Sequence, residues 1–204
     1  TFNPFEEHTY VIYDDTRECA IIDPGCYTQQ EQATLSAFIE QHSLSVKHLI
    51  NTHAHIDHVL GNHYVKSTYG VKLALHDLDL PTLQLAAQYA AKYGFPNYQP
   101  TEADLLLGDV IQVGNSTLTV LHVPGHAPGH VALYSARDKL CLAGDVLFKR
   151  SIGRTDLPGG DHTLLMQSIH QQLFPLGDEV VIYPGHGPAT TIGTEKRHNP
   201  YCQL

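Results

Sequence analysis

The sequence contains no tryptophan, a single methionine and no run of 18 or more apolar residues. Without such a run there is no candidate for a membrane span, and the chain does not open on the charged and apolar segments of a secretory signal. Basic residues are also few, because 12 Lys and Arg stand against 21 Asp and Glu, for a formal net charge of -9. Binding to phosphates needs a basic surplus, so nucleic acid is not expected as a partner.

Cysteine is scarce as well, and its four residues form no C-x-x-C pair. They are Cys19, Cys26, Cys141 and Cys202, of which Cys19 and Cys141 lie in apolar, strand-like runs. This pattern is typical of small buried side chains in a reduced protein. We therefore interpret the chain as cytoplasmic.

The length of 204 residues suits one domain with a substantial core, and we expect a single domain over 1–204. Apolar runs bounded by turn residues predict strands at 8–13, 19–23, 46–51, 71–75, 110–113, 116–123, 130–135, 139–143 and 179–183. Helical spacing of apolar residues predicts helices at 29–42, 63–69, 78–93 and 164–173. Strands and helices alternate twice, which favours an α/β sandwich of two sheets with outer helices.

Histidine is abundant, with 15 residues, and it is concentrated at one point. Positions 53–58 read His-Ala-His-Ile-Asp-His, directly after the strand predicted at 46–51. Imidazole and carboxylate groups are the ligands that ions such as Zn2+ prefer. Alternation places His53 and His55 on one side of an extended segment, and Asp57 and His58 follow beyond the turn. The segment can therefore serve two neighbouring metal positions; the alternative is a solvated loop rich in histidine.

Three further polar residues follow predicted strands, each beside glycine or proline. His126 follows the strand at 116–123, Asp145 follows 139–143, and His186 follows 179–183. Glycine lets the backbone approach a site closely, and rigid strands hold a site in place. Each histidine alone would more often be structural, but together with positions 53–58 they supply the ligands that two metal sites lack.

These motifs together resemble the metallo-β-lactamase fold superfamily, and within it the glyoxalase II-like hydrolases. The likeness rests on positions 52–58, 124–130, 144–148, 153–156 and 184–188 and covers nearly the whole chain. It implies a four-layer αβ/βα sandwich with the metal site at one edge of the two sheets. Only 18 residues follow His186, so the chain resembles the short-tailed members, which have no separate C-terminal helical domain.

The resemblance also implies a ligand set for two divalent ions, with zinc as the first choice and iron or manganese as alternatives. The first ion would be held by His53, His55 and His126, the second by Asp57, His58 and His186, and Asp145 would bridge them. His130 is not a ligand in the family, and we interpret it as a supporting residue. Asp23, in Asp-Pro-Gly, is either a carboxylate that orients a ligand imidazole or a turn residue.

The expected reaction is hydrolysis of a thioester such as S-lactoylglutathione. A water held by two cations supplies hydroxide near neutral pH, and that hydroxide attacks the carbonyl carbon. Asp57 is placed to orient this nucleophile and accept its proton. A thiolate leaving group needs no dedicated acid. For a carboxylate-bearing substrate, Lys149, Arg150 and Arg154 are candidate contacts. Lys149 and Arg150 are equally often solvated loop charges, whereas Arg154 is instead a structural residue or one at the edge of the site.

Other functions also remain open on the sequence alone. Positions 153–156 and 199–200 resemble persulfide dioxygenase, which uses one iron on the first-site ligands and performs oxidation. A metal-binding protein without catalytic activity is the second alternative, and lactonase or β-lactamase activity is a weaker one. The predicted partner is a small molecule, either a thioester or another ester, and the oligomeric state is not indicated.

Overall fold

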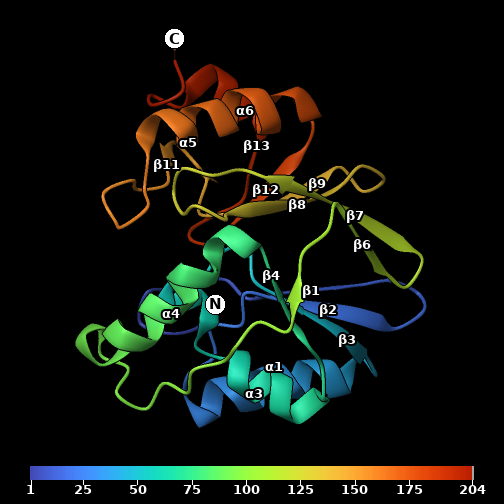
Figure 1. The fold of residues 1–204 in the computed structure, drawn as a ribbon. Coiled ribbons are helices and arrows are strands. Elements are labelled where there is room, and N and C mark those ends of the chain that lie inside the picture. Colours follow the sequence, from blue (N-terminus) through green and yellow to red (C-terminus); the bar gives the residue numbers. More distant parts are fainter. Residues whose placement is uncertain (204) are drawn as a thin grey trace. The chain divides into compact units, whose positions relative to one another are not determined.

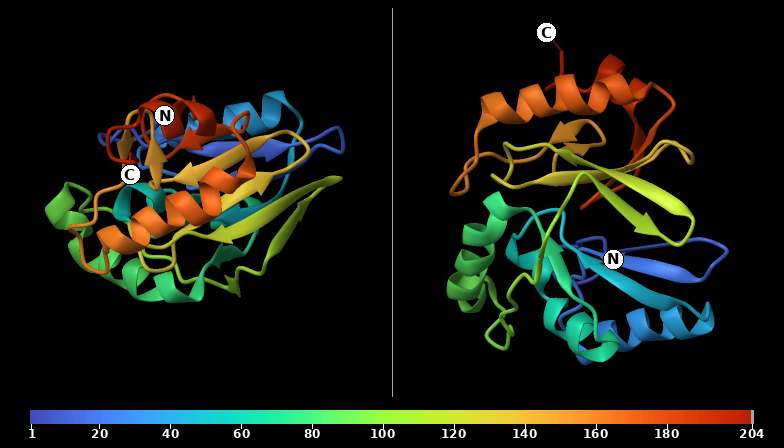
Figure 2. Two further views of the ribbon diagram at one scale, coloured as in Figure 1. Left: turned by 90° about the horizontal axis from the view of Figure 1, so that it is seen from above. Right: turned by 45° about the vertical axis from the view of Figure 1, so that its right-hand side comes forward.

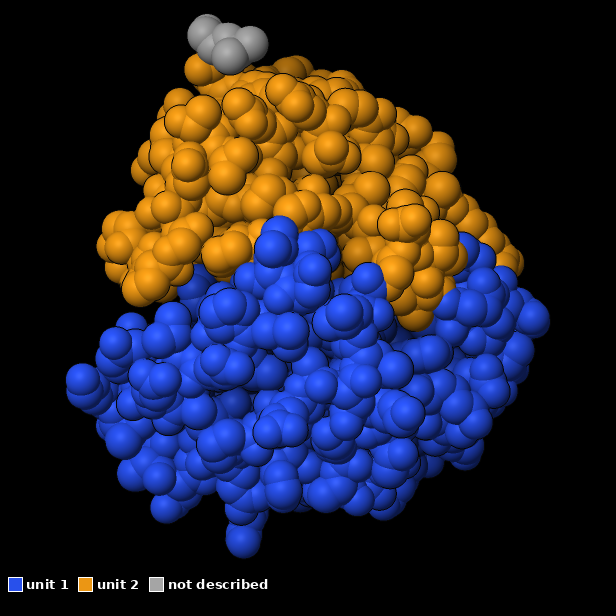
Figure 3. All heavy atoms as spheres, viewed as in Figure 1, with its two compact units in different colours: residues 1–107, 112–117 blue, residues 108–111, 118–204 orange. Residues whose placement is uncertain are grey.

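The structure, a computed structural model, describes residues 1–203. Its chain forms two compact units (Figure 3). Unit 1 comprises residues 1–107 and 112–117, and unit 2 comprises residues 108–111 and the chain from 118 onward. The single domain expected from the length stays a prediction, and each unit is described by itself below.

Unit 1 contains a sheet whose five strands lie in the order of the sequence. They are β1 (Tyr10–Tyr13), β2 (Glu18–Ile22), β3 (Ser45–Ile50), β4 (Leu73–Leu75) and β5 (Leu105–Leu106). β1 and β2 are antiparallel, and the remaining neighbours are parallel. Residues 19–22 of β2 are fully buried, and Cys19 and Ile21 belong to the core of unit 1. The two-residue β5 had no counterpart in the sequence prediction.

Helices α1 (Gln29–Gln41) and α3 (Asn62–Tyr69) lie on one face of this sheet (Figures 1 and 2). α1 starts at a capping box, in which the Thr28 side chain accepts from the Glu31 amide and Glu31 bonds back to Thr28. Burial opposes the ionised form of Glu31, but bonds from Thr28 and other backbone amides hold its pKa below the usual value.

The prediction of one continuous helix at 78–93 is wrong. The segment consists of a 3-10 turn η1 (Asp77–Asp79), α4 (Leu80–Tyr89) and a second 3-10 turn η2 (Ala90–Tyr93). Pro81 has no N–H to donate and fits only the first turn of an α-helix, so the regular helix begins there. Gly94 ends the segment with a left-handed φ of 94°.

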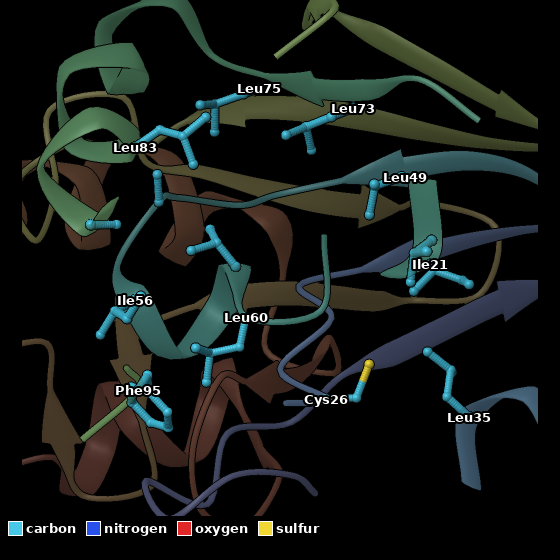
Figure 4. Close-up of a cluster of buried hydrophobic side chains, with 14 of the residues drawn as sticks. Ile21, Cys26, Leu35, Leu49, Ile56, Leu60, Leu73, Leu75, Leu83 and Phe95 are labelled. Carbon is cyan, nitrogen blue, oxygen red and sulfur yellow. The ribbon is translucent and has the colours of Figure 1, made fainter. Parts of the chain in front are cut away.

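The core of unit 1 lies between its sheet and its helices (Figure 4). Ile21, Leu49 and Leu73 project from three neighbouring strands, and Leu35 reaches this cluster from α1. Ile56 extends the same cluster into the segment that follows β3. Each fully buried aliphatic side chain contributes about 1.5–3 kcal/mol. The histidine-rich segment is therefore anchored in the core by its own apolar residue.

Unit 2 is built on a sheet of order β13-β12-β9-β8-β7-β6. Its strands are β6 (Val110–Val113), β7 (Ser116–His122), β8 (Val131–Ser135), β9 (Leu140–Gly144), β12 (Val181–Pro184) and β13 (Thr190–Thr191). A separate hairpin pairs β10 (Leu147–Phe148) with β11 (Ser151–Ile152). β9 and β12 are neighbours and run parallel, so both end at the same edge of the sheet.

One face of this sheet is covered by α5 (His162–Ser168) and α6 (Ile192–His198) (Figures 1 and 2). α5 continues as a π-turn η3 (Ile169–Leu173) and a 3-10 turn η4 (Phe174–Leu176), so the helix predicted at 164–173 exists but starts two residues earlier. Its start is set by Asp161, whose side chain accepts from the Leu164 amide. α6, β10, β11 and β13 were not predicted from the sequence.

The tip of the β6–β7 hairpin belongs to unit 1 because it packs on the turn between β1 and β2. The Asp14 carboxylate accepts from the amides of Thr16 and Asn115 and from the Ser116 hydroxyl, at 2.9, 2.7 and 3.1 Å. Bonds from the Thr16 hydroxyl and amide, with those from Asn115 and Ser116, lower the pKa of Asp14 to about 2.

The four cysteines are buried and unpaired, as the sequence predicted for their environment. Burial raises the pKa of the Cys26 and Cys141 thiols to about 12, so neither is a reactive thiolate at neutral pH. Among residues 1–203, no helix combines the length and the apolar character needed to span a membrane.

Candidate metal centre

In unit 1, β3 delivers the histidine-rich segment to the start of a short helix, α2 (Ile56–Val59). His55 occupies the N-cap position of α2, so Asp57 and His58 lie on a helical turn while His53 precedes it in extended chain. The ring centroid of His53 lies 4.8 Å from that of His55 and 4.1 Å from that of His58. Asp57 Oδ2 lies 3.7 Å from His58 Nε2. The four candidate ligands of this unit therefore lie together, although the helical turn was not predicted.

Asp23 is the hydrogen-bond centre beneath this segment. It follows β2 in a left-handed conformation with φ 49° and is almost fully buried. Its two carboxylate oxygens accept from the amide and the hydroxyl of Thr52, at 2.7 and 2.6 Å. Oδ2 also lies 3.1 Å from His58 Nδ1. A His58 ring that donates from Nδ1 carries its lone pair on Nε2, which is the arrangement a metal-binding imidazole needs.

Glu7 was not predicted as a site residue, because in the sequence it is only one of two adjacent acidic residues near the start of the chain. Its side chain is completely buried, with Oε1 3.9 Å from His58 Nδ1 and Oε2 accepting from the Thr9 hydroxyl at 3.2 Å. Burial raises the pKa of Glu7 well above its usual value, although the neighbouring His58 opposes that shift.

Asp79 is a second buried carboxylate that sequence patterns did not reveal. Its Oδ2 accepts from the Ala54 amide at 2.6 Å, and its Oδ1 accepts from the Thr82 hydroxyl at 3.0 Å. The first bond fixes the backbone between His53 and His55, and the second joins that backbone to the first turn of α4. The spacing of the two imidazoles thus depends on a residue 25 positions further along the chain.

In unit 2, two imidazoles point toward one carboxylate oxygen. His126 Nε2 lies 3.6 Å from Asp145 Oδ2, and His186 Nε2 lies 3.5 Å from the same atom. These separations are too long for hydrogen bonds. They suit N and O atoms that share an ion at bond lengths of about 2.0–2.2 Å, since such ligand pairs stand about 3–3.6 Å apart. The donor types and the spacing in unit 2 therefore fit divalent metal.

Backbone groups fix both sides of this cluster. His126 Nδ1 lies 2.8 Å from the carbonyl oxygen of Arg154, which leaves Nε2 as the ligand atom. His130 Nε2 accepts from the Asp145 amide at 3.0 Å, which places His130 beside a predicted ligand. Gly153 lies so close to the strand end that an added Cβ would stand 2.0 Å from the Asp145 carbonyl oxygen. Gly153 and Arg154 thus support the cluster through their backbone.

The three candidate cations for substrate binding lie in unit 2 with different surroundings. Arg154 forms two 2.7 Å hydrogen bonds to Asp156, which lower the pKa of that carboxyl to about 2. Arg150 donates from its guanidinium to the His198 carbonyl at 2.8 Å. Lys149 is exposed at the turn of the β10–β11 hairpin.

Glu195, on α6, holds this hairpin in place and was not predicted. It is fully buried and accepts from the Arg150 amide, the Asn199 side chain and the Thr190 hydroxyl, at 2.8, 2.9 and 2.5 Å. Asn199 in turn donates to the Ser151 carbonyl at 2.9 Å. The segment after Asp145 is therefore fastened to the last helix of the chain.

Comparisons with known proteins agree with this fold. The model of the metallo-β-lactamase superfamily matches residues 3–186. Hydroxyacylglutathione hydrolase GloC of Haemophilus influenzae is 37% identical over 201 residues, which are 97% of this chain and 93% of that protein. Among solved structures, BLEG-1 B3 metallo-β-lactamase has a TM-score of 0.90 at 37% identity, covering 99% of this chain and 97% of that one.

A second solved structure, TTHA1623 in a di-iron-bound form, has a TM-score of 0.86 at 36% identity, with 98% of each chain covered. The fold class predicted from the sequence is thereby confirmed. The family match, the extent of these two similarities and the histidine and aspartate clusters lead to one assignment: the chain belongs to the metallo-β-lactamase superfamily.

Proposed function

We propose that this protein is a metal-dependent thioester hydrolase of the glyoxalase II type, acting on a substrate such as S-lactoylglutathione. The observation that carries the proposal is the convergence of His126 Nε2 and His186 Nε2 on Asp145 Oδ2, which suits a carboxylate that bridges two ions. The similarity to a hydroxyacylglutathione hydrolase along nearly the whole chain supports the choice of substrate class.

The proposed centre holds two divalent ions. His53, His55 and His126 would hold the first, Asp57, His58 and His186 would hold the second, and Asp145 would contribute to both. Zinc is the proposed metal, with manganese or iron as alternatives; a relative 36% identical was crystallised with two irons. When bound, the ions would lower the pKa of a water and polarise a carbonyl group.

The side chains around the centre orient its ligands and move a proton. Asp57 accepts the proton of the attacking water and fixes its direction toward the substrate carbonyl. Asp23 holds His58, and the Arg154 carbonyl holds His126, so each of these imidazoles presents Nε2. The leaving thiolate is stable near neutral pH, and the reaction therefore needs no dedicated acid.

For the substrate, we propose that the β10–β11 hairpin supplies positive charge to a carboxylate of a glutathione conjugate. Lys149 is the proposed direct contact, because its side chain is exposed at the turn. Arg150 and Arg154 add charge at the same loop, and each would bind a substrate in competition with its present contact, the His198 carbonyl or Asp156. Variants Lys149→Ala and Arg150→Ala should raise KM more than they lower kcat.

The test combines metal analysis with a thiol-release assay on S-lactoylglutathione. Two bound ions and rapid release of thiol, abolished by a chelator and restored by metal, would support the proposal. One iron per chain with oxygen uptake on glutathione persulfide would contradict it and indicate a dioxygenase. Bound metal without turnover of any thioester would also contradict it and indicate a binding protein.

β-Lactam hydrolysis is a second candidate, because the BLEG-1 metallo-β-lactamase is 37% identical over almost the full length of both chains. The same preparation should therefore be assayed with a chromogenic cephalosporin. A kcat/KM for the cephalosporin above that for every thioester would favour this function over the proposed one.

A further inference from the structure

Residues 2–9, named here the N-terminal strap, form a tight hairpin against the histidine-rich segment of unit 1. The Phe2 amide donates to the Glu7 carbonyl at 2.8 Å, and the Glu6 amide donates to the Asn3 carbonyl at 3.1 Å. Asn3 and Glu6 both adopt left-handed conformations, with φ of 51° and 57°. Asparagine tolerates this conformation better than most residues, so its presence at position 3 is compatible with the turn.

The N-terminal strap is bonded to the turn that follows β2. The Thr9 hydroxyl oxygen lies 3.0 Å from the Asp23 carbonyl oxygen and accepts from the Gly25 amide at 2.9 Å. Gly25 packs so tightly that an added Cβ would stand 2.0 Å from Glu7 Oε2 and 2.9 Å from the Asp57 carbonyl oxygen. This turn thus has the strap on one side and the proposed ligand segment on the other.

Asn3 links these two sides through a single amide group. Its Nδ2 donates to the Gly25 carbonyl and to the Asp57 carbonyl, both at 3.1 Å. Its own backbone amide donates to Glu31 Oε1 at 2.6 Å, which fastens the strap to the start of α1. An amide NH2 has two donors, and here both serve carbonyl groups of segments 22 and 54 residues away in sequence.

The bond from Asn3 to the Asp57 carbonyl replaces a backbone hydrogen bond that the short helix α2 does not form. In a continuing α-helix, the amide four residues on would donate to the Asp57 carbonyl. That residue is Gly61, and its amide donates to the Pro24 carbonyl at 2.6 Å. Asn3 supplies a donor to the Asp57 carbonyl in this position. The amide side chain therefore stabilises the end of the one turn that carries Asp57 and His58.

We propose that Asn3 is a positioning residue for the second metal: by bonding the Asp57 carbonyl to the Gly25 turn, it fixes the helical turn that presents Asp57 and His58. The inference rests on the proposed function insofar as those two residues are metal ligands. A purely stabilising role of Asn3 would be different: it would affect unfolding without affecting the local order of residues 56–61 or the affinity for one particular ion.

The test uses Asn3→Gly, which keeps the left-handed backbone without strain and removes only the side chain. Ser43→Gly is the matched control, because Ser43 also has a left-handed φ, of 52°, and lies in the turn after α1. Asn3→Asp is a second variant, of the same size and without N–H donors. Metal affinities are measured by titration of the metal-free protein with zinc, and backbone order by amide hydrogen exchange.

In Asn3→Gly and Asn3→Asp we expect one of the two zinc equivalents to lose affinity by about 10–100-fold, as for residues that orient a ligand, with the other unchanged. Amide exchange at 56–61 in the metal-free protein should rise by about 10-fold or more, with β3 unaffected. Ser43→Gly should match the wild type in both measurements.

The proposal is overturned if the Asn3 variants unfold at a lower temperature but keep wild-type zinc affinities and wild-type exchange at 56–61. It is also overturned if both zinc equivalents weaken equally. Failure of the thioester assay in the wild type would refute the proposed function alone, because zinc titration and hydrogen exchange do not depend on turnover.

Discussion

The Asp145 amide donates a hydrogen bond to His130 Nε2 at 3.0 Å, inside a fully buried environment. His130→Ala removes the acceptor and leaves the amide unsatisfied, which should lower the free energy of unfolding by about 1–3 kcal/mol. The metal content should remain at two equivalents, as measured by elemental analysis beside a urea titration. His162→Ala, an exposed residue at the start of α5 in the same unit, is the control and should change neither quantity.

Loss of a whole metal equivalent in His130→Ala would show instead that His130 is a ligand. The distinction follows from the ring atom involved, because a nitrogen that accepts from a backbone amide is not available to an ion.

Asp57→Asn should cut kcat by about 100-fold or more, the scale expected when a positioned general base is lost. The variant should also bind the second ion with lower affinity, while its circular dichroism spectrum and its unfolding transition remain near those of the wild type. Asp15→Asn, in the exposed turn between β1 and β2, provides the control. Wild-type turnover in Asp57→Asn on the best substrate would exclude Asp57 from the mechanism.

Asp79→Ala should remove the hydrogen bond that fixes the backbone between His53 and His55. The Ala54 amide would lose its buried acceptor, at a cost of about 1–3 kcal/mol in the free energy of unfolding. We expect the affinity for the first ion to fall more than that for the second, as measured by zinc titration. The control is Asp77→Ala, an exposed residue of the same 3-10 turn. Equal losses at both ions would contradict a local effect on His53 and His55.

The pH dependence of unfolding should contain a contribution from Asp14. Its pKa in the folded protein is about 2, below the usual value of 3.8, because hydroxyl and amide groups bond to the ionised carboxylate. A lowered pKa stabilises the fold above the unfolded value and loses that contribution as the pH falls toward 2. Melting temperatures of Asp14→Asn and wild type should therefore differ above pH 4 and converge near pH 2. A constant difference across that range would contradict the assignment.

The sequence allowed prediction of the residues that follow strands, and it did so for a physical reason. An apolar strand followed by His126, Asp145 or His186 is a local pattern, and the ends of neighbouring strands lie at one edge of a sheet. The segment at 53–58 was found in the same way. The alternation of strands and helices indicated a sandwich of two sheets, the resemblance of these motifs to a known family implied its four-layer form, and the structural neighbours confirm the fold class.

The supporting residues were not predictable in this way. Glu7, Asp79 and Glu195 are buried carboxylates, and each has at least one contact that is distant in sequence, with His58, Ala54 and Arg150 respectively. Nothing in their local sequence distinguishes them from solvated charges. The turn of α2 was also missed, since four residues with two ligands show no helical period. Strands of two residues, such as β5 and β13, are too short for any periodicity.

The contacts of Glu195 determine how far the chain must extend beyond the last proposed ligand for the metal centre to be ordered. The last proposed ligand is His186, so a protein ending soon after it would contain every predicted metal-binding residue. Such a truncation would remove α6, which carries the acceptor for the Arg150 amide, and Asn199, which donates to the Ser151 carbonyl. The hairpin next to Asp145 would lose its fastening. We therefore expect the final helix to be indispensable for a defined bridging carboxylate, even though it carries no ligand of its own.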